Sequence, residues 1–117
     1  MKRITSLELL EQINFYRKQD KKKDRGHNDL LLIIETEFTG IRRAEISDNY
    51  SKIKEKLVKE NIKVGEYTLP GGNQKYIMYI LTISQAKQVL FKESRFVRRA
   101  VIKFLEEING YSKKSSQ

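Results

Sequence analysis

The chain has 117 residues, with 24 lysines and arginines against 15 aspartates and glutamates, which gives a formal net charge of +9. This length fits one domain with its own core, and no apolar run is long enough to predict a transmembrane helix. Cysteine is absent, which excludes disulfides, thiolate metal sites and cysteine nucleophiles.

The first predicted helix begins at a capping pattern. Thr5 and Glu8 have the Thr-x-x-Glu spacing in which a hydroxyl and a carboxylate satisfy backbone amides at a helix start. An apolar stripe follows, and the helix is predicted to end near Phe15. From Arg17 to Gly26 six cations meet two acids, a composition typical of a mobile, solvated linker or frayed helix end. The competing interpretation is an arm that contacts phosphates.

A second helix is predicted from Leu30 to Phe38, because Leu30, Ile34 and Phe38 recur on one helix face. Asn28 or Asp29 caps its start, and Gly40 is a plausible stop. The charged stretch 42–61 then predicts a surface helix with an interruption near Ser47-Asp48-Asn49.

A β-hairpin is predicted next, with strands at 66–69 and 75–81 joined through Pro70-Gly71-Gly72-Asn73-Gln74. The second strand alternates, so Ile77, Tyr79 and Leu81 share one face. Two glycines in the connection supply the positive φ that a tight reversal needs. The strand ends where Thr82 and Gln85 form a second capping pattern.

Two helices follow the hairpin, one from Ser84 to Lys92 and one capped by Ser94. The second has an apolar stripe at Val97, Val101, Phe104 and Ile108 and ends at Asn109-Gly110. Residues 111–117 are predicted to be a disordered tail. The sequence therefore predicts a single α+β domain over residues 1–110, with one β-hairpin followed by two C-terminal helices.

Side chains for catalysis are few. The single His27 has no cysteine partner and no second histidine at metal-ligand spacing, so neither an enzyme nor a metal site is predicted. No cofactor is expected. The start of the chain lacks the long apolar region of a secretion signal, so we expect a soluble, cytoplasmic protein without membrane contact.

The order of four segments resembles the phage regulatory protein Rha, or phage antirepressor-like, family. These segments are Thr5-Ser6-Leu7-Glu8-Leu9-Leu10, Gly26-His27-Asn28-Asp29-Leu30-Leu31-Leu32-Ile33-Ile34, Tyr76-Ile77-Met78-Tyr79-Ile80-Leu81-Thr82, and Phe91-Lys92 with Val101 through Glu107. The chain departs from the family pattern in its longer insert from Arg17 to Arg25 and in Ile83-Ser84-Gln85 where Asp-Gly is expected. The resemblance implies a phage- or prophage-encoded regulator, cytoplasmic in the host cell, that binds DNA through a winged-helix-like unit or binds and opposes a repressor.

The charge predicts attraction to a polyanion, with nucleic acid ahead of an acidic protein surface and an anionic membrane. We expect DNA binding in which the helix from Leu30 lies in the major groove and the hairpin tip acts as a wing. If that helix belongs to the core, the basic face of the last helix is the better nucleic-acid surface. The residues predicted to bind nucleic acid are Arg17, Lys18, Lys21, Lys22, Lys23, Arg25, His27, Asn28, Lys75, Arg95, Arg98, Arg99 and Lys103.

The same sequence features also allow a protein partner, RNA or a homodimer. A phage-type inhibitor that binds a host or repressor protein at its nucleic-acid site needs only the same cations. RNA binding is a further alternative, because Tyr16, Tyr67, Tyr76 and Tyr79 offer rings on which bases stack. The apolar face of the last helix would suit a homodimer, although the hairpin needs the same face as cover.

Overall fold

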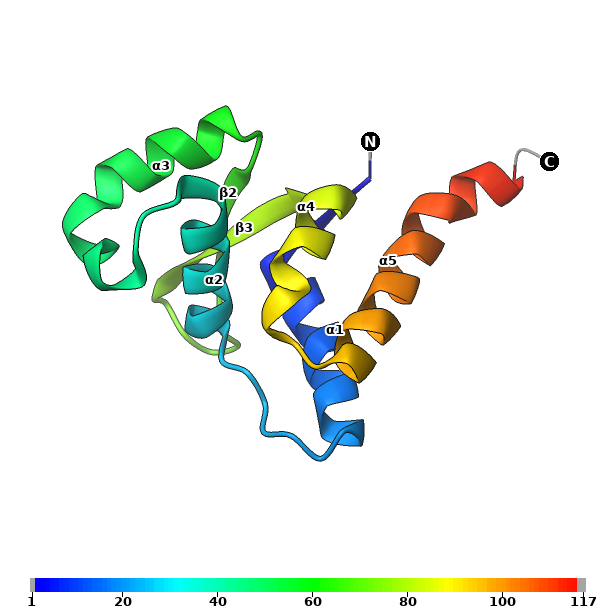
Figure 1. The fold of residues 1–117 in the computed structure, drawn as a ribbon. Helices are drawn as coiled ribbons and strands as arrows, with labels where there is room; N and C mark the ends of the chain where they lie inside the picture. The colour runs from blue at the N-terminus through cyan, green and yellow to red at the C-terminus, as the bar shows by residue number, and fades with distance from the viewer. Residues whose placement is uncertain (1, 116–117) are drawn as a thin grey trace.

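A computed structural model describes the backbone of residues 2–115 and the side chains of residues 2–110. Within that part lie five α-helices, three short 3₁₀ turns and three β-strands, which confirms the predicted α+β class (Figure 1). In chain order they are β1 (Arg3–Thr5), α1 (Ser6–Gln19), α2 (His27–Thr39), 3₁₀ turns at Arg43–Glu45 and Ser47–Asn49, α3 (Tyr50–Lys59), β2 (Lys63–Thr68), β3 (Lys75–Thr82), α4 (Ile83–Gln88), a 3₁₀ turn at Val89–Lys92 and α5 (Arg95–Ser115).

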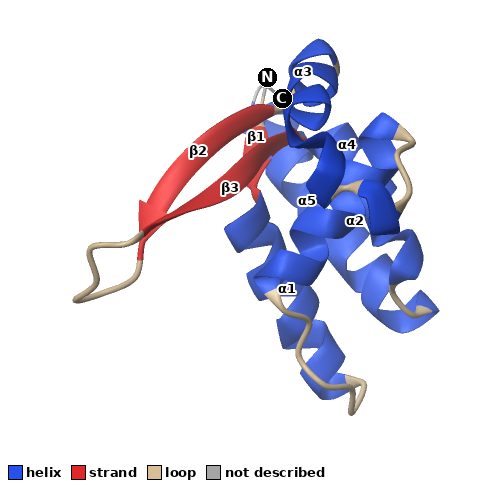
Figure 2. Cartoon of the chain, turned by 90° about the vertical axis from the view of Figure 1, so that its left-hand side faces the viewer, coloured by secondary structure: helices blue, strands red, loops and turns tan. Residues whose placement is uncertain are grey.

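The strands form an antiparallel sheet in the order β1-β3-β2, so β3 is central. β2 and β3 pair from Lys63 opposite Ile80 to Thr68 opposite Lys75, which confirms the predicted hairpin and lengthens its strands. The sequence does not predict β1, which pairs with the end of β3, because three residues are too few for periodicity to reveal. Figure 2 shows the hairpin projecting beyond the helices.

Three predicted helix starts are confirmed by their hydrogen bonds, whereas the start of α2 is wrong: this helix begins at His27 after Gly26, and neither Asn28 nor Asp29 caps it. Thr5 Oγ1 accepts from the Glu8 amide at 3.1 Å, and Glu8 Oε1 accepts from the Thr5 amide at 2.9 Å. Thr82 and Gln85 repeat this reciprocal pair at 3.1 and 2.9 Å, which stops β3 and begins α4. Ser94 Oγ accepts from the amide of Val97 at 3.3 Å, as expected of the residue that caps α5.

Two predicted helix ends are wrong. α1 continues past Phe15 to Gln19, because arginine, lysine and glutamine are good helix formers. α5 continues past Asn109-Gly110 to Ser115, since an isolated glycine costs a helix only about 1 kcal/mol. The predicted tail 111–117 therefore overlaps α5, and its last residues, 116 and 117, lie outside the described part.

The helices and the sheet share one hydrophobic core. Its fully buried side chains come from every α-helix and from β3, and include Leu9, Ile13, Leu30, Ile34, Ile53, Leu57, Tyr79, Leu81, Ala86, Val101 and Leu105. The apolar stripe of α5 packs mainly against α1 and α4. Val97, Val101 and Leu105 are completely buried there, whereas Phe104 and Ile108 of the same helix are only half-buried.

A buried tyrosine–carboxylate pair joins α2 to the sheet. The Tyr79 hydroxyl from β3 donates a hydrogen bond to Glu35 Oε2 from α2, and both residues are buried. Burial raises the pKa of the Glu35 carboxyl above its usual 4.5, and the bond from Tyr79 offsets this only in part. Burial and the neighbouring carboxylate raise the pKa of the Tyr79 hydroxyl.

The variant Glu35→Gln is expected to flatten the pH dependence of stability. Between pH 4.5 and the raised pKa of Glu35, the folded chain keeps a proton that the unfolded chain releases, so stability falls as pH rises through this window. Glutamine cannot ionise, and its amide oxygen still accepts from Tyr79. Urea unfolding at a series of pH values measures the effect. Glu37→Gln, on the exposed face of α2, should leave the profile unchanged, and identical profiles for both variants would contradict the prediction.

Candidate nucleic-acid interface

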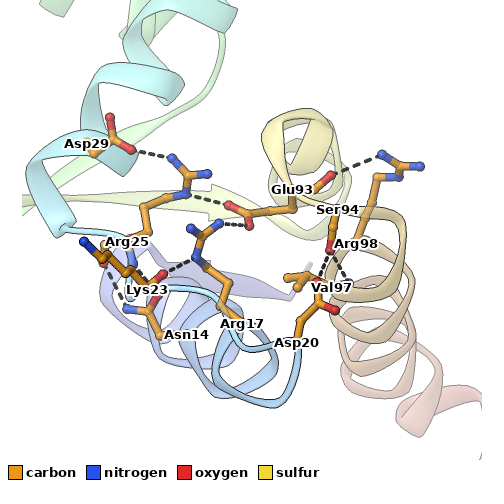
Figure 3. A network of polar contacts seen from close by, with 10 residues as sticks. All are labelled: Asn14, Arg17, Asp20, Lys23, Arg25, Asp29, Glu93, Ser94, Val97 and Arg98. Atoms are coloured by element: carbon orange, nitrogen blue, oxygen red, sulfur yellow. Dashed lines mark hydrogen bonds and ion pairs between the residues drawn. The ribbon is translucent and has the colours of Figure 1, made fainter.

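Two arginines predicted to contact phosphates form ion pairs within the protein instead. Arg17 and Arg25 converge on the carboxylate of Glu93, with Arg17 Nη1 at 2.7 Å from Oε1 and Arg25 Nε at 2.5 Å from Oε2 (Figure 3). Arg25 also pairs with Asp29, which in turn lies 3.2 Å from Arg43. The Glu93 side chain is only 2% exposed, so it needs these partners. The prediction that Arg17 and Arg25 hold phosphates is therefore corrected.

The same contacts keep Arg25 charged. Burial lowers the pKa of its guanidinium, but the hydrogen bonds and charges of Glu93 and Asp29 outweigh that effect and raise the pKa overall. The ion pairs are thus strong structural contacts between the α1–α2 linker and the segment that precedes α5.

The linker itself is held by hydrogen bonds. The Asn14 side chain donates to the carbonyl of Arg25 at 3.0 Å and accepts from its amide at 2.7 Å, while Arg17 Nε donates to the carbonyl of Lys23 at 2.7 Å. Ser94 Oγ donates to Asp20 Oδ2 at 2.8 Å, which ties the end of α1 to the start of α5 (Figure 3). A linker fixed by long-range contacts replaces the mobile loop that the charge run predicts.

Seven other cations of α1, the linker and the described side chains of α5 are exposed. We call this set the basic surface, and its members are Lys18, Lys21, Lys22, Lys23, Arg95, Arg99 and Lys103. All seven are exposed, and none of them forms an ion pair with a residue whose side chain is described. The bond between Asp20 and Ser94 joins the two halves of this surface, since it connects the linker to the residue before Arg95.

Lys21 adopts a backbone conformation that usually belongs to glycine. Its φ is +57°, and it occupies the residue after the cap of α1, where the amide of Lys22 donates to the carbonyl of Arg17 at 2.8 Å and its own amide donates to Lys18 at 3.1 Å. This pair of bonds is the Schellman motif. A left-handed non-glycine residue costs about 1–2 kcal/mol, so the fold gives up stability to keep a lysine here.

Lys21→Gly is therefore expected to raise the free energy of unfolding by about 1 kcal/mol, because glycine accepts this φ without strain. It should also weaken binding to a polyanion, because one cation of the basic surface is lost. Lys22→Gly removes the same charge at a residue without positive φ, and is expected to give no gain in stability. Chemical unfolding of both variants tests this, and equal stabilities would contradict it.

His27 is a structural side chain. Its Nε2 lies 2.9 Å from Ser6 Oγ, its Nδ1 lies 3.2 Å from the Tyr67 hydroxyl, and Ser6 Oγ also accepts from the amide of Tyr79 at 3.0 Å. Burial lowers the pKa of the imidazole, so it is neutral at pH 7. These contacts anchor the start of α2 to α1 and to the hairpin, and they leave Asn28 as the exposed residue at that helix end.

α2 is a core helix. Leu30, Leu31, Ile33, Ile34 and Glu35 are buried, and only Asn28 and Glu37 are exposed along its length. A helix that reads the major groove needs polar side chains along one outward face. The expectation that this helix lies in the groove is therefore corrected, and the exposed basic face of α5 becomes the better candidate.

The outward face of α5 carries cations and an aromatic ring. Arg95, Phe96, Arg99, Ala100 and Lys103 line a shallow depression of about 570 Å³. Arg98, also predicted to bind nucleic acid, is half-buried instead, and its guanidinium lies 3.4 Å from the carbonyl of Glu93. Between Arg95 and Leu105 every charged residue is a cation, and the exposed Glu106 and Glu107 follow one turn after Lys103.

The hairpin tip is separate from the basic surface. Its loop turns at Gly71, where φ is +78°, and Lys75 is exposed at the start of β3. Figure 1 shows the hairpin and α5 on opposite sides of the molecule. Seven of the thirteen predicted residues are thus exposed on α1, the linker and α5, and Lys75 lies apart from them on the hairpin.

The tyrosines proposed as stacking platforms are mostly covered. Tyr79 is buried, while Tyr67 and Tyr76 are half-buried and lie against each other with ring centroids 5.6 Å apart. Two other exposed rings, Phe15 and Phe96, stand close in the sequence to cations of the basic surface. Their signal is their position within three residues of Lys18 and next to Arg95, respectively.

Comparisons with known proteins identify no relative of this chain. No family model matches it, and no curated protein or solved structure is significantly similar to it. Among the described residues, no three histidine or acidic side chains gather as a metal site would require. No helix in the described part is both long and apolar enough to cross a membrane.

Proposed function

We propose that this chain is a phage- or prophage-type transcriptional regulator or antirepressor, similar to the Rha family, that binds DNA through the basic surface. The observation that carries the proposal is the set of seven exposed cations on α1, the linker and α5, without an ion-pair partner among the described side chains. Such unneutralised cations attract the phosphate backbone of nucleic acid.

The order of elements supports a winged-helix-like interpretation. β1 and the three helices α1, α2 and α3 precede the hairpin, and the strand order β1-β3-β2 places the hairpin beside the strand that leads into α1. A hairpin that projects from the helices, as in Figure 2, is where a winged-helix domain carries its wing. Lys75 at the base of the hairpin loop lies on the other side of the molecule from α5, so a phosphate held by this wing would belong to a contact separate from the basic surface.

The hydrogen bonds that hold the linker favour phosphate binding by its lysines. Asn14, Arg17 and Glu93 hold the linker in one conformation, so Lys21, Lys22 and Lys23 lose less entropy when they meet phosphates than they would in a mobile loop. Because α2 is buried and is not part of the basic surface, few side chains there are suited to base-specific contacts. We therefore propose binding that depends mainly on charge and little on sequence.

A salt titration tests the proposal. If about five phosphates are neutralised, log K plotted against log salt concentration for a labelled duplex should have a slope near −4.5. Fluorescence anisotropy at several potassium chloride concentrations gives this slope. A flat response, or no binding to any duplex at low salt, would discard the proposal.

A second candidate function is a protein-interaction inhibitor that occupies the nucleic-acid site of a host or repressor protein. It is favoured by Phe96, which lies exposed between Arg95 and Arg99, because aromatic residues and arginine are enriched in protein interfaces. Pull-down from host lysate, with and without nuclease, separates the two functions. A partner protein retained after nuclease treatment supports the inhibitor, and loss of all bound material supports nucleic acid.

A further inference from the structure

Two phenylalanine rings interrupt the basic surface. Phe15 on α1 is 56% exposed and Phe96 on α5 is 48% exposed, which is unusual for side chains of this size. Tyr16 lies between them, with its ring centroid 5.0 Å from that of Phe15 and 6.4 Å from that of Phe96, edge-on to both. These contacts hold the rings at the surface, although burial would be the ordinary outcome for phenylalanine.

Cations and rings alternate across this surface. Phe15 and Lys18 are three residues apart on α1, and Phe96 and Arg99 have the same spacing on α5, so each ring shares a helix face with a cation. Arg95, Arg99 and Lys103 follow each other at four-residue steps, an arrangement of like charges that weakens an isolated helix. A polyanion bound along these cations would offset their mutual repulsion.

The alternation matches one class of polyanion. Each nucleotide of a single strand offers one phosphate for a cation and one flat base face for an aromatic ring. In an intact duplex the base faces are stacked on each other, so a duplex leaves both phenylalanine rings without a partner. A second copy of this chain is disfavoured, because its own basic surface would be brought against this one.

We infer that the basic surface takes single-stranded DNA, with unpaired bases stacked on Phe15 and Phe96 and phosphates held by Lys18, Arg95 and Arg99. This inference rests on the proposed DNA binding and names the form of DNA that the same surface prefers. It assigns the regulator to melted or unpaired regions of its target, where base faces are open.

The test compares an oligodeoxythymidylate strand with a mixed-sequence duplex of the same length, by fluorescence anisotropy on the full chain. The double variant Phe15→Ala with Phe96→Ala should weaken binding of the single strand about tenfold or more and leave duplex binding within about twofold. Phe91→Ala is the matched control, since Phe91 is 49% exposed in the 3₁₀ turn before α5. It should change neither affinity. Circular dichroism checks that the variants remain folded, as expected for exposed rings.

The possible results distinguish this inference from the proposed DNA binding on which it rests. Duplex binding that exceeds single-strand binding, or a double variant that binds both probes like the parent chain, would overturn the inference and leave DNA binding intact. Failure of both probes to bind would overturn the proposed function as well. Stronger binding of an oligouridylate strand than of the oligodeoxythymidylate strand would assign the rings to RNA and also overturn the inference.

Discussion

Replacement of Glu93 by alanine is expected to lower the free energy of unfolding by about 3–5 kcal/mol. The carboxylate is the shared partner of Arg17 and Arg25, whose side chains are only 16% and 13% exposed. Without it, Arg17 loses its ion-pair partner and Arg25 keeps only Asp29, although both guanidinium groups stay largely buried. Because a domain of this size has a total stability of about 5–15 kcal/mol, the variant should unfold at a much lower urea concentration.

Two further variants show whether the loss comes from unpaired charge. Glu106→Ala removes the exposed pair with Lys87, 3.3 Å long, and should cost at most about 1 kcal/mol. The triple variant Arg17→Met, Arg25→Met and Glu93→Met should recover much of the stability, since apolar side chains of similar volume replace the whole buried cluster. Equal stabilities of Glu93→Ala and Glu106→Ala would show that the cluster contributes little.

Charge reversal on α5 should have the largest effect on binding. The triple variant Arg95→Glu, Arg99→Glu and Lys103→Glu is expected to reduce the affinity for DNA roughly 10²- to 10³-fold at low salt, because three phosphate contacts are lost and three repulsions replace them. The slope of log K against log salt should also become shallower by about 3. Anisotropy titrations of the parent and variant chains measure both quantities. These three side chains are exposed, so the variant is expected to stay folded, and urea unfolding checks this.

A second triple variant shows whether DNA binding depends on the cations of α5 or only on the net charge of the protein. Lys52→Glu, Lys59→Glu and Lys63→Glu change the net charge by the same amount, at exposed positions on α3 and β2. These elements lie across the molecule from α5 in Figure 1. Their reversal should reduce the affinity much less. Similar losses in both triple variants would mean that the protein's overall charge drives binding, and that no particular surface does.

Some features could be predicted because they depend on neighbouring residues. A hydroxyl and a carboxylate or amide three residues apart determine where α1 and α4 begin, and alternation of apolar side chains determines β3. The interruption before α3 is likewise confirmed, as two 3₁₀ turns at Arg43–Glu45 and Ser47–Asn49. The hairpin follows from its glycine-rich loop. In each case the deciding hydrogen bonds join residues that are close in the sequence.

The candidate site depends on contacts that no local pattern contains. Arg17 and Arg25 look like phosphate contacts within their basic run, yet Glu93, 76 and 68 residues away, takes them both. The apolar spacing of α2 does not show whether one side of the helix or all of its sides are packed against other elements. Only the tertiary structure therefore shows that α2 is a core helix.

The sequence by itself determined the α+β class, the hairpin, the starts of three helices and the surplus of positive charge. Only the tertiary structure decided which cations are exposed and which are paired inside, and that Phe15 and Phe96 stand among the exposed ones. The physical reason is range: capping and periodicity act over three or four residues, whereas burial and ion pairing depend on which distant segments the fold brings together.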